Sequence, residues 1–233
     1  MSDPILTLDE INTYYGDAHI LHDLSAEVGE GEVVGMIGRN GAGKTTTLKS
    51  IIGLQPPRSG TITFDGERID GKKPETIAQR GVGYIPEERN IFANLSVREN
   101  LLVGLHRGQE PDFDVVFDYF PRLEDRVDQR AGTLSGGEQQ MLAIARTLVS
   151  DPELLLIDEP TEGLMPTLVE AISGIVEQLN EDGYSIFLVE QNLDLVLNVA
   201  DRVYVLDTGE SPFNGTIEEF QAERESVEKH LTV

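Results

Sequence analysis

The sequence contains no cysteine among its 233 residues. This absence excludes disulfides, thiolate chemistry and cysteine metal sites, and it fits a reducing compartment. Long apolar runs are also missing, since none approaches the ~18 residues that a membrane span requires. The first residues, Met1, Ser2 and Asp3, place no basic residue ahead of an apolar stretch, so we expect no signal peptide. We expect a cytoplasmic protein, and its hydrophobic content of 39% is adequate for one folded core.

Basic residues are scarce, with 18 against 42 acidic residues, and the formal net charge is −24. Five of the basic residues are lysines, namely Lys44, Lys49, Lys72, Lys73 and Lys229. A field of this sign repels nucleic acid, so we expect no nucleic-acid partner. The acids are dispersed, which is typical of a solvated surface rather than an acidic tail. Such a surface resembles that of proteins from salt-loving microbes; an acidic protein from an ordinary organism is the alternative.

Short apolar segments alternate with amphipathic ones, which predicts an α/β fold with a mostly parallel sheet. Buried strands are expected at residues 33–37, 83–85, 154–157 and 186–189. Helices are expected at residues 45–52, 136–149 and 167–180. One face of the last helix would be formed by Leu168, Ile172, Ile175, Val176 and Leu179.

Two regions break this alternation. Residues 5–28 and 61–64 suggest antiparallel strands beside the parallel sheet. Residues 97–130 are mainly helical in pattern, with a polar interruption at residues 108–114 that contains proline and aspartate. We therefore expect a single domain over residues 1–233, with a helical subdomain inserted at approximately residues 88–150.

Residues 38–45 read GRNGAGKT, the pattern of a phosphate-binding loop. Glycines let backbone N–H groups turn toward phosphate oxygens, and the following helix adds the partial positive charge of its N-terminus. Lys44 is expected to reach the β- and γ-phosphates, and the Thr45 hydroxyl is expected on Mg²⁺. A chance match is the alternative, but the position between an expected strand and an expected helix argues against it. The expected nucleotide-binding residues here are Gly38, Arg39, Asn40, Gly41, Ala42, Gly43, Lys44, Thr45 and Thr46.

Two adjacent acids follow the apolar segment LLLI. Asp158 ends the expected strand, where a metal-site carboxylate would lie beside the phosphates. Glu159 comes next and can act on the attacking water as general base or as a positioning group. Adjacent acids after a strand can also be a simple turn, but downstream of a phosphate loop that alternative is weak.

The segment LSGGEQQ at residues 134–140 indicates a different kind of anion-binding site. Ser135, Gly136 and Gly137 open an expected helix, so free N–H groups and a hydroxyl would form a second anion-binding end. One chain cannot easily wrap both this end and its own phosphate loop around one γ-phosphate. We therefore expect a head-to-tail pair of subunits, with each nucleotide between one loop and the partner's Ser-Gly-Gly. An ordinary capped helix explains the serine but not the paired glycines, which are poor helix formers.

These three motifs, in this order, resemble the nucleotide-binding domain of ABC ATPases, and the resemblance covers essentially the whole chain. It implies a P-loop NTPase core with ATP and Mg²⁺ as cofactors. It also implies that Tyr15, in the run TYYG, stacks on adenine. Tyr14 is the neighbour to consider instead, and a tyrosine that only packs locally in a strand is the further alternative. The signature residues that would bind nucleotide are Ser135, Gly136, Gly137 and Glu138.

Three positions depart from the commonest pattern of that family. Glu87 follows Pro86 where the family usually has a glutamine that touches Mg²⁺ and the attacking water. Gln191 stands where a histidine usually contacts the γ-phosphate, and it can donate a hydrogen bond but cannot become cationic. Residues 162–165 read EGLM in place of the frequent SALD. A catalytically weakened subunit is one interpretation, but the other motif residues are all present. The expected catalytic residues are Lys44, Glu159 and Gln191. The expected metal-site residues are Thr45, Asp158 and Glu87.

A better interpretation is that the departures mark a subfamily. The strings YIPEERNIF, HDLSAEV, GAGKTTTLKSIIGL, AGTLSGGEQQMLAIAR and IFLVEQN resemble an ATP-binding subunit of branched-chain amino acid importers, the LivF type. The resemblance implies a subunit that hydrolyses ATP to power such an importer. Importers of urea or short amides stay open as alternatives, as do a soluble ABC mechanoenzyme and a binding-only nucleotide sensor.

The same resemblance implies the partners. They are a second ABC ATPase subunit, identical or related, two membrane permease subunits, and indirectly an extracellular solute-binding protein. The permeases would dock near residues 88–100. The chain would then lie at the cytoplasmic face of the cell membrane, held there peripherally by the permeases.

Overall fold

The computed structural model describes residues 4–106 and 108–231. The strands of this part of the chain are β1 (Leu6–Tyr15), β2 (Ala18–Val28), β3 (Val33–Gly38), β4 (Ser59–Phe64), β5 (Glu67–Arg68), β6 (Val82–Ile85), β7 (Leu154–Asp158), β8 (Ser185–Glu190), β9 (Arg202–Asp207) and β10 (Glu210–Thr216). The α-helices are α1 (Lys44–Ile51), α2 (Pro74–Ala78), α3 (Val97–Gly104), α4 (Asp114–Tyr119), α5 (Pro121–Glu124), α6 (Gly136–Leu148), α7 (Pro166–Glu181), α8 (Leu193–Val199), α9 (Ile217–Ala222) and α10 (Arg224–Val227). Two 3₁₀ turns are η1 (Ala131–Thr133) and η2 (Glu228–His230).

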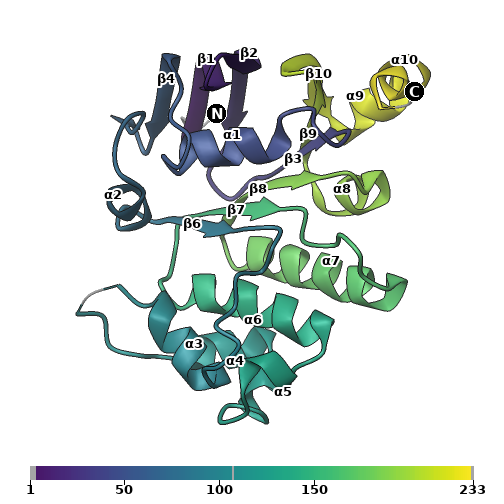
Figure 1. Cartoon of the computed structure of the whole chain (residues 1–233). Coiled ribbons are helices and arrows are strands. Elements are labelled where there is room, and N and C mark those ends of the chain that lie inside the picture. The colour runs from purple at the N-terminus through teal and green to yellow at the C-terminus, as the bar shows by residue number, and fades with distance from the viewer. Residues whose placement is uncertain (1–3, 107, 232–233) are drawn as a thin grey trace.

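The larger of two sheets has six strands in the order β10-β9-β3-β8-β7-β6. The strands from β9 to β6 run parallel, and β10 pairs antiparallel with β9 at one edge. The smaller sheet, β2-β1-β4-β5, is antiparallel. Figure 1 shows α1 between the two sheets, with α6 and α7 on the other side of the larger sheet. The expected α/β fold, with its antiparallel N-terminal part, is confirmed.

The central strands are buried on both faces. Every residue of β3, β7 and β8 is buried, which is typical of parallel strands covered by helices on each side. Met36 and Leu156 face the core shared with α1 and the antiparallel sheet, whereas Ile37 and Ile157 face the core shared with α6, α7 and α8. Alternate residues of each strand therefore serve two different cores.

The helical region between β6 and β7 contains α3, α4, α5, η1 and α6. Phe113 and Phe120 belong to the same core cluster as Ile157 of β7, so this region is packed continuously against the sheet. The interruption between α3 and α4 lies between Gly104 and Asp114, somewhat wider than the sequence indicates. The subdomain limits at residues 88–150 stay a prediction.

The parallel strands β3, β6, β7 and β8 end at the same edge of the sheet, and the loops after them follow one another in space. Such an edge is where α/β sheets bind ligands. The segments that directly follow these strands carry, in chain order, Lys44 at the start of α1, then Glu87, Glu159 and Gln191. No helix within the described residues is both long enough and apolar enough to cross a bilayer.

Candidate nucleotide site

The segment between β3 and α1 is a tight turn that depends on glycine. Gly41 and Gly43 have φ values of 82° and 118°, in the left-handed region that glycine tolerates. A Cβ at Gly43 would lie 2.7 Å from the side chain of Leu21, so a larger residue would both strain the backbone and displace Leu21. α1 begins directly afterwards at Lys44, which turns the positive end of the helix dipole toward the loop.

A cavity of about 310 Å³ lies over this turn and the start of α1. Its lining consists of Ile20, Asn40, Gly41, Gly43, Lys44, Thr45, Thr46, Glu87 and Glu159. Most of the predicted phosphate-binding residues therefore border one space. Gly38, Arg39 and Ala42 lie outside the lining. A Cβ at Gly38 would approach the Leu206 carbonyl oxygen to 2.5 Å, and the Ala42 N–H donates to the Arg39 carbonyl oxygen at 3.1 Å within the turn.

Lys44 is held at the mouth of the turn by three oxygen atoms. Only 3% of its side chain is exposed, and its Nζ lies 3.1 Å from Glu159 Oε1. The same Nζ donates to the carbonyl oxygens of Gly38, at 2.7 Å, and Arg39, at 3.0 Å. The predicted phosphate-contacting lysine and the predicted base are thus in direct contact.

Asp158 ends β7 with its side chain between two hydroxyls. The Thr45 hydroxyl donates to Asp158 Oδ1 at 3.0 Å, and the Tyr84 hydroxyl donates to Oδ2 at 2.9 Å. Burial raises the pKa of Asp158 above its ordinary value, and the two hydrogen bonds oppose that shift. A hydroxyl and a buried carboxylate in contact beside a phosphate cavity form a donor set of hard oxygens, which fits Mg²⁺.

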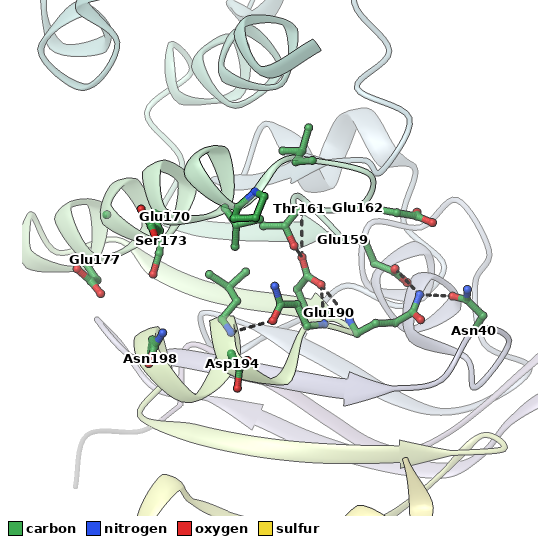
Figure 2. A pocket seen from close by; sticks show the side chains of 17 residues that line it. Asn40, Glu159, Thr161, Glu162, Glu170, Ser173, Glu177, Glu190, Asp194 and Asn198 are labelled. Carbon is green, nitrogen blue, oxygen red and sulfur yellow. Dashed lines mark hydrogen bonds between the residues drawn. The ribbon is translucent and has the colours of Figure 1, made fainter. Parts of the chain in front are cut away.

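Glu159 leaves the strand with an unusual backbone. Its φ of 43° is left-handed, a conformation that a non-glycine residue rarely adopts, and its N–H donates to the Val189 carbonyl oxygen at 2.9 Å. Its carboxylate contacts Lys44 through Oε1 and accepts from Gln191 Nε2 at 2.9 Å through Oε2. Gln191 Nε2 also donates to Asn40 of the glycine loop. Lys44 and Gln191, which follow two other strands, therefore meet at the carboxylate of Glu159. In Figure 2 dashed lines mark the hydrogen bonds that connect Glu159 with Asn40 through the Gln191 amide.

Glu87 lines this cavity and also a neighbouring hollow that contains Thr45 and Asp158. A hydrogen bond with Glu162 raises the pKa of Glu87 to about 7, and burial and the charges of Glu159 and Asp158 act in the same direction. The structure thus brings Glu87 into the neighbourhood that the family resemblance implies.

The two neighbouring tyrosines near the end of β1 have different surroundings. Tyr14 stacks on His19 with ring centroids 4.1 Å apart, and the Arg58 guanidinium lies 4.2 Å from its ring centroid. Tyr15 is 44% exposed and lies outside the lining of the phosphate cavity. Tyr14 is therefore occupied on its faces, which leaves Tyr15 as the better candidate for stacking on a base.

The LSGGEQQ segment begins α6 through a capping box. Ser135 Oγ accepts from the Glu138 N–H at 3.3 Å, and Glu138 Oε2 accepts from the Ser135 N–H at 2.8 Å. The Ser135 hydrogen bonds lower the pKa of Glu138. Packing explains the glycine at residue 137, because a Cβ on Gly137 would lie 2.6 Å from the Leu168 side chain. None of the residues 134–140 lines the phosphate cavity, so the structure does not bring this segment to the loop of its own chain.

Sequence reasoning missed several residues that support the site. Tyr84 holds Asp158, and the buried Glu190 accepts hydrogen bonds from Thr161 and from the backbone after β8. Tyr84 is the penultimate residue of β6, and its pattern indicates only a strand. The contacts of Tyr84 with Asp158 and of Thr161 with Glu190 join residues far apart in the sequence, so no local motif indicates them.

Comparison with known proteins decides the family. The sequence profile described as ABC transporter matches residues 21–162. The chain belongs to the ABC transporter family. As an ABC ATPase it has an ATP-hydrolysing domain that binds nucleotide, which the three motifs predicted.

Two curated relatives are similar to this ABC ATPase over most of their length. The high-affinity branched-chain amino acid transport ATP-binding protein BraG of Pseudomonas aeruginosa is 47% identical over 209 residues, covering 88% of this chain and 90% of BraG. The probable branched-chain amino acid transport ATP-binding protein LivF of Archaeoglobus fulgidus is 39% identical over 225 residues, covering 94% of this chain and 95% of LivF. A solved ATP-binding cassette of an ABC transporter in its ADP conformation is similar in fold, with a TM-score of 0.86 and 27% identity, covering 98% of each chain.

Proposed function

We propose that this chain is the ATP-hydrolysing subunit of an importer for branched-chain amino acids. The observation that carries the ATPase site is that Lys44 and Glu159 line the cavity over the glycine loop in contact with each other. Gln191 contacts Glu159, and Asp158 contacts Thr45 of the cavity lining. The likeness to BraG and LivF supports the cargo. Import of urea or short amides, and a soluble mechanoenzyme, are the outcomes that the test below separates.

The proposed chemistry assigns one task to each group. The loop from Gly38 to Thr46 and the start of α1 hold the triphosphate, and Lys44 neutralises its β- and γ-oxygens. Thr45 and Asp158 would hold Mg²⁺ with Glu87 beside it, and the ion would neutralise phosphate charge. Glu159 would accept a proton from the attacking water.

Three further assignments complete the proposed site. Gln191 would donate its amide N–H to the γ-phosphate, and Tyr15 would stack on adenine. The residues Ser135, Gly136, Gly137 and Glu138 would close over the nucleotide of a second ABC ATPase subunit. Support for this last assignment is that the start of α6 lies outside the cavity of its own chain.

The proposed permease contact is a hollow of about 500 Å³ between the sheet and the helical region. Leu54, Phe92 and Val103 line it and are 54%, 46% and 51% exposed, which is unusual for large apolar side chains. Tyr84 lines the same hollow and donates a hydrogen bond to Asp158. Tyr84 would therefore connect a bound permease segment with the metal-site carboxylate.

Through two permeases and an external solute-binding protein, the chain would act at the cytoplasmic face of the membrane. No nucleic-acid partner is proposed, because the net charge is −24.

The test is ATP-driven uptake into membrane vesicles that contain the native permeases and either wild-type or Glu159→Gln chain. We expect uptake of leucine, isoleucine or valine with wild type, and a loss of ATP hydrolysis of about a hundredfold or more with Glu159→Gln while ATP still binds. Glu170→Gln, an exposed carboxylate on α7, is the control for charge. Hydrolysis that survives Glu159→Gln would refute the assigned base. Uptake of urea or amides alone, or of no solute, would refute the assigned cargo.

A further inference from the structure

Glu190 is the last residue of β8 and a buried carboxylate to which the proposed chemistry gives no task. Its exposed fraction is 2%. Its two oxygens accept four hydrogen bonds from residues on two separate segments (Figure 2). Within the described residues it forms no ion pair, so these donors alone satisfy a buried charge.

Each carboxylate oxygen of Glu190 accepts hydrogen bonds from one segment of the chain. Oε1 accepts from the Thr161 N–H at 3.1 Å and from the Thr161 hydroxyl at 2.5 Å. Oε2 accepts from the N–H groups of Gln191, at 2.9 Å, and Asn192, at 3.0 Å. Thr161 follows Glu159 by two residues, and Gln191 is the side chain that contacts Glu159. One buried carboxylate therefore connects the turn that carries the base with the turn that carries its hydrogen-bond donor.

We propose that Glu190 is a positioning residue for ATP hydrolysis, which fixes the Glu159 turn and the Gln191 turn relative to each other. The inference rests on the proposed roles of Glu159 and Gln191. The 2.9 Å contact between Gln191 Nε2 and Glu159 Oε2 depends on the placement of both backbones, and Glu190 is bonded to both. Small displacements of catalytic groups reduce rate strongly, because the reacting geometry is lost.

A carboxylate is required here rather than an amide. All four partners are donors, and a glutamine offers one acceptor oxygen and one NH₂ group. Whichever way the amide is turned, its NH₂ would face N–H donors of one segment and release that segment. Glu190→Gln therefore keeps the shape of the side chain and breaks the connection between the turns.

The experiment compares steady-state ATP turnover and ATP affinity of the full chain in wild type and Glu190→Gln. We expect kcat to fall about tenfold or more, because hydrogen bonds to a charged group are lost, while the dissociation constant for ATP changes less than about twofold. Glu177→Gln makes the same charge change at an exposed residue of α7 and should leave both values unchanged. Glu190→Gln with wild-type kcat, or with kcat and affinity reduced together, would overturn the proposal.

Two further variants keep the test decisive if Glu190→Gln folds poorly. Glu190→Asp retains both oxygens on a shorter side chain and should keep more activity than the amide. Thr161→Val removes one donor and leaves the three N–H donors, so its kcat should lie between those of wild type and Glu190→Gln. A Thr161→Val or Glu190→Asp chain that is as inactive as the amide variant counts against the proposal.

A double-mutant cycle with Gln191→Ala separates positioning from general stability. If Glu190 acts through Gln191, adding Glu190→Gln to Gln191→Ala should reduce kcat by less than it does in wild type. Fully additive losses would overturn the inference. Glu159→Gln in the same assay distinguishes a failure of the proposed ATPase site from a failure of the role proposed for Glu190. An active Glu159→Gln chain refutes the proposed site, whereas an inactive one alongside a fully active Glu190→Gln chain refutes the role of Glu190 alone.

Discussion

The carboxyl of Glu87 lies among other carboxyls, and its stability contribution should depend on pH. Its pKa in the folded chain is about 7, against 4.5 as the ordinary value. Between these values the folded chain binds more protons than the unfolded chain, so this group favours folding below about pH 4.5 and loses that contribution as pH rises toward 7. The effect is reduced because the side chain is exposed to water.

We predict that Glu87→Gln flattens this part of the pH profile of the nucleotide-free chain. The measurement is the free energy of unfolding in urea at several pH values from about 4.5 to 8. Glu88→Gln, which removes the neighbouring charge in the same hollow, is the matched control. A Glu87→Gln profile parallel to that of wild type would contradict the raised pKa.

Among the single residues of the site, the sequence predicts those whose role follows from local spacing. Lys44, Asp158 and Glu159 stand at fixed positions after a loop or strand, and the structure places them together. Glu190 and Thr161 could not be predicted, because their contact joins residues 29 apart and needs the register between β7 and β8. The partnership of Tyr84 with Asp158 spans 74 residues and has the same explanation.

The crossing of α3 and α6 depends on a glycine. A Cβ at Gly104, the last residue of α3, would lie 1.9 Å from the Arg146 carbonyl oxygen and 2.7 Å from Val149 Cγ2. Since the carbonyl belongs to the backbone of α6, the two helices would have to separate. We predict that Gly104→Ala lowers the free energy of unfolding by about 1–3 kcal/mol, the usual cost of overpacking. Urea unfolding measures it.

Gly174 in α7 is the matched control, since a Cβ there would meet no atom within 4 Å. Alanine is the better helix former, so Gly174→Ala should stabilise the chain by about 0.5–1 kcal/mol. Opposite signs for the two substitutions are the expected result. Equal effects at both positions would show that α3 and α6 are not in the close contact described.

Helices and strands with strong patterns were predicted well, and weakly patterned ones were not. The predicted helix at residues 136–149 is α6, because Ser135 and Glu138 form a local capping box. Residues 97–130, predicted as mainly helical with an interruption, contain three short helices in their described part, α3, α4 and α5. Pro121 begins α5, and Phe113 and Phe120, on either side of α4, make contacts in the core. Those contacts are tertiary and leave no periodic signal.

The whole molecule carries a net charge of −24, and its self-repulsion should make stability depend on salt. Raising KCl from about 0.1 M to about 1 M shortens the Debye length from about 10 Å to about 3 Å, which screens that repulsion. We predict a rise in the free energy of unfolding at neutral pH, measured by urea denaturation. Near pH 4.5, where many carboxyls are protonated, the rise should be smaller.

Full stability in dilute buffer, with no gain from KCl, would contradict the interpretation of the acidic surface as one suited to high salt. An equal gain at both pH values would assign the effect to the salt itself rather than to screening. The sequence predicts the sign of the charge but not its distribution, because surface placement depends on the fold. The pairing of two chains likewise stays a prediction at this scale.

The buried contact of Lys44 with Glu159 makes ATP binding an exchange of partners. A phosphate that takes the ammonium group must displace a carboxylate 3.1 Å away, so we expect an affinity for ATP weaker than the phosphate contacts alone would give. On the proposed assignment the displaced carboxylate is the general base. Binding of ATP would then free the Glu159 carboxylate from Lys44. The base would therefore be available only while the phosphate loop is occupied.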